Sequence, residues 1–122
     1  MNNENKQILK QLLKNETLPN ISNKDYVETL GLDNEYTKIE ATKLLDSYNE
    51  LKWWLSSDIK VRAYGQLLES KLIIPFDDML DGLKIILERP VATIELAGNL
   101  DGIRNKVAKT VCKYLNNVNP EL

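Results

Sequence analysis

Five apolar side chains recur at alternating spacings of three and four residues in the middle of the chain: Ala41, Leu44, Tyr48, Leu51 and Leu55. This spacing places them on one stripe of an α-helix, which can then pack against a neighbouring helix. The sequence "TKIE" (residues 37–40) has the form of a capping box, in which a hydroxyl and a carboxylate satisfy free backbone amides. The pattern predicts one long central helix near residues 37–55, with a start near Asp33 as the alternative.

Further apolar stripes, each bounded by turn or cap residues, predict helices near residues 3–15, 23–30, 59–71, 75–88 and 100–116. The segment 90–98 allows either a short helix or a strand, because several of its residues are β-branched. The chain has only five glycines and four prolines, and no pair of alternating strands is visible. We therefore expect an all-α fold, a compact bundle of about five to six helices that forms a single domain over residues 1–122.

The overall composition gives no electrostatic reason to expect binding to nucleic acid or to an anionic membrane. The formal net charge is −2, and the longest apolar run, "LIIPF", is far shorter than the roughly 20 residues of a membrane span. No apolar stretch of the kind found in signal peptides occurs near the N-terminus, and Cys112 is the single cysteine. We therefore expect a cytoplasmic protein without membrane association. The excess of lysine over arginine indicates AT-rich coding, as in many bacteria and phages.

Most enzymatic chemistries are excluded by residue type. Without histidine and with one cysteine, the chain has no histidine-activated nucleophile, no histidine-ligated metal and no zinc–thiolate site. Three aspartates, Asp77, Asp78 and Asp81, have the spacing of a magnesium-binding cluster, but the first two also suit the positive end of a helix. We expect no enzyme activity, no cofactor and no metal; a magnesium-dependent carboxylate enzyme is the third alternative.

Residues 22–52 have the pattern of a helix–turn–helix, in which a short helix and a turn are followed by a longer helix. In such a domain the second helix enters the major groove of DNA and begins with residues that bind bases and phosphates. Here that helix begins with Asp33, Glu35 and Glu40 against Lys38, and the carboxylates oppose phosphate binding. A DNA-binding regulator is therefore the second alternative, and binding to nucleic acid is not favoured.

The last predicted helix carries Lys106, Lys109 and Lys113 opposite its apolar stripe, with Arg104 alongside. This basic side is either a solvated face or a surface for an acidic partner. Cys112 lies next to the apolar stripe, and we expect it to be buried as a small hydrophobic residue.

Two tryptophans, Trp53 and Trp54, are adjacent at the end of the predicted central helix. In a continuous helix Trp54 lies about 100° from the apolar stripe and Trp53 about 140° from it. One alternative is that the helix is central and both rings are core. The other is that Trp54 is structural while Trp53 is an exposed anchor for a partner or for self-association, on one surface with Asp46, Asn49 and Glu50.

By elimination, we expect a small protein that acts by binding another protein. An inhibitor, an immunity or antitoxin-like factor, or a phage-type accessory factor would fit. The sequence does not identify the partner and leaves a homodimer open. The predicted buried core consists of Leu44, Leu51, Leu55, Leu83, Ile103, Val107 and Val111.

Overall fold

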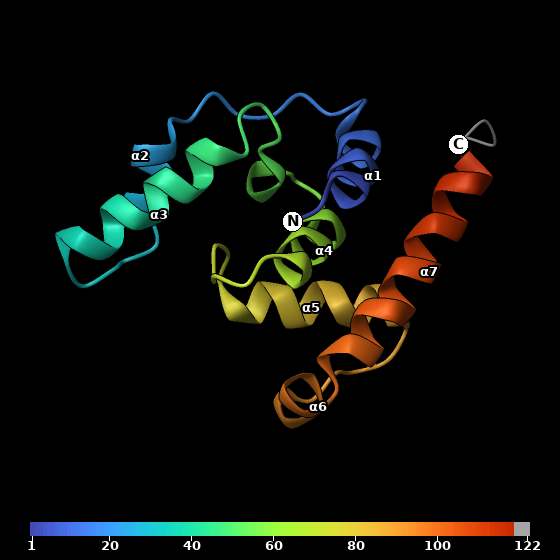
Figure 1. The fold of residues 1–122 in the computed structure, drawn as a ribbon. Helices are drawn as coiled ribbons and strands as arrows, with labels where there is room; N and C mark the ends of the chain where they lie inside the picture. The colour runs from blue at the N-terminus through green and yellow to red at the C-terminus, as the bar shows by residue number, and fades with distance from the viewer. Residues whose placement is uncertain (119–122) are drawn as a thin grey trace.

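The computed structural model describes residues 1–118, and over that range the regular structure is helical, as predicted (Figure 1). The described chain contains seven α-helices rather than five to six, and one short 3₁₀-helix, η1. Their bounds are α1 (Asn3–Leu13), α2 (Asn23–Glu28), α3 (Glu35–Ser47), η1 (Trp53–Leu55), α4 (Ile59–Leu68), α5 (Phe76–Leu87), α6 (Thr93–Gly98) and α7 (Leu100–Val118). The helical alternative for the segment before Gly98 is therefore confirmed.

The start of α3 is fixed by Asn34 and not by the predicted capping box. Asn34 Oδ1 accepts a hydrogen bond from the backbone amide of Thr37 at 2.8 Å and another from the Thr37 hydroxyl at 2.9 Å. The threonine hydroxyl is thus engaged with the true N-cap residue, three positions before the predicted start of the helix. The earlier start, proposed as the alternative, is the one that the structure adopts.

The predicted long helix over residues 37–55 is wrong, because α3 ends at Ser47. Asn49 adopts a left-handed backbone conformation with φ 56°, a region that asparagine enters more readily than most residues. The chain therefore turns away from the helix axis before it forms η1. Leu44 and Leu51 are only half-buried, whereas the other five predicted core residues are buried.

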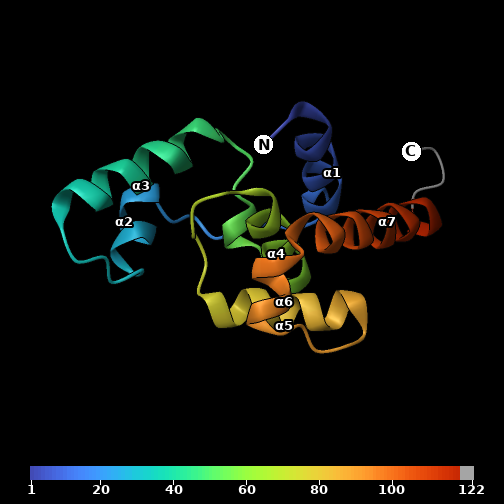
Figure 2. The ribbon, with the colours of Figure 1, turned by 60° about the horizontal axis from the view of Figure 1, so that its bottom comes forward.

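Helix α4 is the centre of the fold and packs against α1, η1, α5 and α7 (Figure 2). Its contact with α5 is close because Gly82 faces the Ala63 side chain and the Ile59 carbonyl of α4, where any Cβ atom would collide. Gly65 of α4 similarly leaves room for the indole ring of Trp53. Two glycines on facing helices thus fix how tightly the core elements approach α4.

Helices α2 and α3 pack against each other and form an arm, residues 23–47, at one edge of the molecule, away from α6 and α7 (Figures 1 and 2). The arm is attached to the rest of the fold by Tyr26, whose ring contacts Trp54 and whose hydroxyl donates to the Ile73 carbonyl at 2.8 Å. Much of the surface of α3 is therefore free of contacts with the helices around α4.

Helix α7 places its apolar stripe on the core with Ile103, Val107 and Val111, as predicted. Cys112 is exposed, so the prediction of a buried thiol is wrong: the residue lies one position beyond the buried stripe. Tyr114 of α7 is 53% exposed. Within the described residues, none of the helices combines the length and the apolar character needed to cross a membrane.

Candidate functional site

Both tryptophans are buried, with exposed fractions of 0% for Trp53 and 2% for Trp54. The prediction that Trp53 is an exposed anchor is therefore wrong, and the prediction that Trp54 is structural is confirmed. The error has a geometric cause, because the angles of the two tryptophans from the apolar stripe were derived for one continuous helix, and α3 in fact ends at Ser47. In η1 the two indoles turn into the core, and the Trp53 ring lies against Gly65.

The tryptophans belong to an aromatic cluster that joins the arm to α4. The ring centroids of Trp53 and Trp54 lie 5.5 Å apart. The ring centroid of Tyr48 lies 6.0 Å from that of Trp53 and 5.7 Å from that of Trp54. The Tyr48 hydroxyl donates to a Glu69 carboxylate oxygen at 2.5 Å. Burial, together with the neighbouring Glu69 carboxylate, raises the pKa of Tyr48. The cluster therefore has a structural role.

The three polar residues predicted to accompany Trp53 are exposed, but they do not share a surface with that ring. Asp46 accepts a hydrogen bond from Asn23 Nδ2 at 2.8 Å, which ties α3 to α2. Asn49 and Glu50 line a shallow hollow that faces Lys10 of α1. Their part in partner binding stays a prediction.

The candidate helix–turn–helix consists of α2 and α3. Both lysines of α3 are already paired, since the Lys38 ammonium lies 3.2 Å from Glu28 and 3.4 Å from Glu35, and Lys43 lies 3.8 Å from Glu40. Hydrogen bonds and charge from the two carboxylates raise the pKa of Lys38. A phosphate would have to compete with these carboxylates, so the arrangement opposes DNA binding.

The aspartates at the start of α5 are not arranged as a metal site. Asp78 lies 3.6 Å from the Arg62 guanidinium, while Asp77 and Asp81 are exposed. Among the described residues, no group of three or more His, Cys, Asp or Glu side chains is placed to hold a metal ion. Asp77 and Asp78 lie in the first turn of α5, where carboxylates stabilise the positive helix end.

The basic residues of α7 divide into two roles. The Arg104 side chain donates to the Leu67 carbonyl at 2.9 Å and thereby links α7 to α4. Lys106, Lys109 and Lys113 are exposed on the side of α7 away from the core. Whether these lysines meet a partner stays a prediction.

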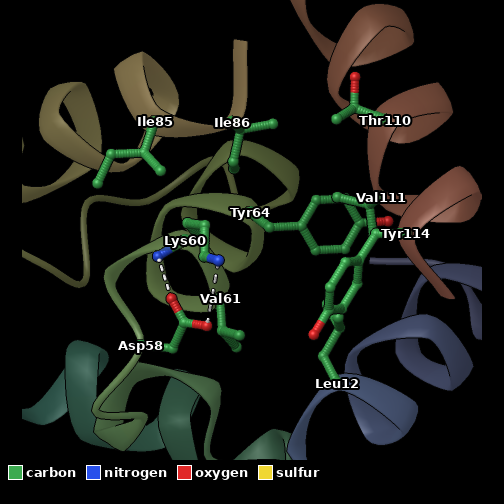
Figure 3. A pocket seen from close by; sticks show the side chains of 10 residues that line it. All are labelled: Leu12, Asp58, Lys60, Val61, Tyr64, Ile85, Ile86, Thr110, Val111 and Tyr114. Carbon is green, nitrogen blue, oxygen red and sulfur yellow. Dashed lines mark hydrogen bonds and ion pairs between the residues drawn. The ribbon is translucent and has the colours of Figure 1, made fainter. Parts of the chain in front are cut away.

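A hollow of about 220 Å³ lies between α1, α4, α5 and α7 (Figure 3). Its walls include Ile86 and Val111, and the Tyr64 ring extends across it from α4 towards α7. The charges that line it, Asp58 and Lys60, face each other at 4.0 Å. The Tyr64 hydroxyl is buried without a hydrogen-bond partner, and burial raises its pKa to about 12. The hollow is small and mainly apolar, and its opposite charges are already paired.

An exposed apolar side chain stands out in the loop between α4 and α5. Leu72 is 58% exposed and borders three separate hollows on the protein surface. The largest of these, about 750 Å³, lies between the loop and α3, where Tyr36 is 73% exposed and Leu44 half-buried. We call Leu72, Tyr36, Leu44 and the lysines at the rim, Lys43 and Lys71, the Leu72 surface.

The loop that carries Leu72 is held by the buried side chain of Gln66, which is 4% exposed. Its amide group makes four hydrogen bonds: it donates to the carbonyls of Lys71 (2.7 Å) and Glu69 (3.3 Å) and accepts from the amides of Ile73 (2.6 Å) and Ile74 (3.0 Å). The backbone on both sides of Leu72 is therefore fixed while its side chain points into solvent. The sequence analysis did not identify Leu72 or Gln66 as site residues. The local feature that points to Leu72 is an apolar run that follows a helix and precedes Pro75.

Comparisons with protein-family models, with curated proteins and with solved structures find no match to this chain. The geometry of the protein itself therefore carries the functional argument.

Proposed function

We propose that the protein acts by binding another protein, and that the Leu72 surface is the binding site. The observation that carries this proposal is a large apolar side chain, 58% exposed, on a loop fixed by four hydrogen bonds from one buried glutamine. A small cytoplasmic inhibitor, an immunity or antitoxin-like factor, or a phage-type accessory factor acts in this way.

The energetic argument rests on preorganisation. Full burial of an exposed leucine contributes about 1.5–3 kcal/mol, and Leu72 is 58% exposed, so its burial contributes roughly 1–2 kcal/mol. A site that is already rigid loses little conformational entropy when a partner binds. Tyr36 lies across the groove from Leu72 and adds an aromatic ring of the type that is enriched at binding hot spots. Lys71 at the rim has no ion-pair partner within the described residues and can pair with a carboxylate of the partner.

The two alternatives have less support. Both lysines of α3 are paired with carboxylates of the protein, which disfavours a DNA-reading helix. A magnesium-dependent enzyme would need clustered carboxylates, whereas Asp78 is directed towards Arg62. Protein binding is the function that uses the exposed leucine on the fixed loop.

The proposal is tested by affinity capture with tagged protein from bacterial lysate, followed by titration of the captured protein in purified form. We expect Leu72→Ser to abolish stoichiometric capture. The matched control is Ile94→Ser on α6, because Ile94 is 82% exposed and does not line the Leu72 surface. Equal capture by the wild type and both variants would contradict the proposed site.

A further inference from the structure

Ile39 of α3 is 51% exposed and does not line the Leu72 surface. Glu35 and Lys43, one helical turn before and after Ile39, are also exposed. Each lies about 40° around the helix from Ile39, and Tyr36 lies about 60° from it on the same side as Lys43. Together Glu35, Tyr36, Ile39 and Lys43 form a continuous patch, the Ile39 face.

The charges of α3 are arranged with opposite signs about Ile39. Glu35 lies four positions before it and Lys43 four positions after it; Lys38 lies one position before it and Glu40 one position after it. If two copies of α3 lie antiparallel with a two-fold axis at Ile39, a residue before Ile39 is level with the residue equally far after Ile39 in the second copy. Glu35 and Lys43 of one copy then lie level with Lys43 and Glu35 of the second copy, whereas Lys38 and Glu40, each about 100° around the helix from Ile39, lie at the outer edges of the pair.

We propose that the Ile39 face pairs with the same face of a second copy of the chain, with the two α3 helices antiparallel and Ile39 at the two-fold axis. The two Ile39 side chains meet at the centre and lose their exposed apolar area. Tyr36 lies beside Lys43 of the second copy, where the ring covers the lysine stem and attracts its ammonium group. Glu35 lies at the same position along the helix axis as that lysine, on the other side of the contact between the two helices.

The charge pattern also selects the direction of pairing. In the antiparallel arrangement the two Glu35 residues are eight positions apart along the axis, about 12 Å at a rise of about 1.5 Å per residue, and so are the two Lys43 residues. A parallel, in-register pair would place Glu35 level with Glu35 and Lys43 level with Lys43. Such like-charge contacts weaken association, so the antiparallel dimer is preferred.

The dimer is weak because its contact is small. Helix α3 has 13 residues, so the contact is about 20 Å long, and it buries less than the roughly 800 Å² per partner of a standard interface. The protein therefore associates only at high concentration. This inference goes beyond the proposed function. The Ile39 face shares Tyr36 and Lys43 with the Leu72 surface but does not include Leu72, so Ile39→Asp and Leu72→Ser test the two proposals separately.

Sedimentation velocity between about 5 and 500 μM, at low and at high salt, tests the inference on the full-length chain. We expect a monomer–dimer equilibrium with a dissociation constant in the tens of micromolar, weakened by salt. Ile39→Asp should abolish it, whereas Ile94→Asp, on exposed α6 surface, should leave it unchanged. Circular dichroism confirms that each variant is folded.

Charge exchange separates this pairing from any other apolar contact. Glu35→Lys alone and Lys43→Glu alone should each weaken the dimer about tenfold, and the double exchange should restore it, because opposite charges are then level again. A monomer at all concentrations would overturn the inference. So would a dimer indifferent to Ile39→Asp, or a double exchange no stronger than the single variants.

Discussion

Replacing Gln66 by methionine should destabilise the protein strongly, although the two side chains have similar size. The change removes the acceptor of two backbone amides, those of Ile73 and Ile74, in residues that are each 1% exposed. A buried donor left without a partner costs about 1–3 kcal/mol, so the two amides together cost about 2–6 kcal/mol. The carbonyls of Glu69 and Lys71 are nearer to solvent and can bond to water. With some relaxation of the loop, we expect a loss of about 2–4 kcal/mol.

Equilibrium unfolding in urea measures this loss, and Gln11→Met is the matched control. Gln11 undergoes the same chemical change, but its buried Oε1 has no hydrogen-bond partner in the native protein. We expect the control to change the free energy of unfolding by less than about 1 kcal/mol. If Gln66→Met costs no more than Gln11→Met, the glutamine does not hold the loop and the argument for a preorganised Leu72 fails.

Three further predictions concern the core, the tyrosines and nucleic acid. Gly65→Ala should cost about 1–3 kcal/mol in thermal unfolding because its Cβ meets the Trp53 ring, whereas Gly98→Ala, with open space around it, should be neutral or stabilising. Burial raises the pKa of Tyr26 and of Tyr64 from 10.0 to about 12, so the folded state keeps protons that the unfolded chain releases. The free energy of unfolding should therefore be unaffected by these groups below pH 10 and fall between pH 10 and 12 in urea titrations; a rise there would refute the assignment. A gel shift at physiological salt should show no duplex-DNA binding tighter than micromolar, and a nanomolar complex would reverse the ranking of functions.

The helices were largely predictable because their ends are encoded locally. Ser22 caps α2, with its hydroxyl 3.1 Å from the Asp25 amide, and Pro75 immediately precedes α5. The end of α3 was not predictable, because the apolar spacing continues through Tyr48 and Leu51 into η1. Only the tertiary structure shows that these later side chains serve the turn and the aromatic cluster instead of one continuous stripe.

The candidate site was harder to predict from the sequence than the fold. Adjacent tryptophans suggested a surface anchor, but the turn at Asn49 buries both rings. Conversely, nothing in the local sequence distinguishes Leu72 from the buried Ile73 and Ile74 that follow it. The distinction arises from the hydrogen bonds of Gln66, a residue several positions earlier that sequence patterns place in an ordinary helix.

The central claim is that Leu72 is the anchor for a protein partner, and the dissociation constant of the purified complex tests it most directly. Isothermal titration calorimetry should be performed with the wild type, Leu72→Ser and the control Ile94→Ser, all at a concentration at which the wild type is monomeric. We predict that Leu72→Ser weakens binding by about 2 kcal/mol, roughly thirtyfold, because hot-spot residues have effects of this size, and that the control binds like the wild type. An unchanged dissociation constant for Leu72→Ser would contradict the account.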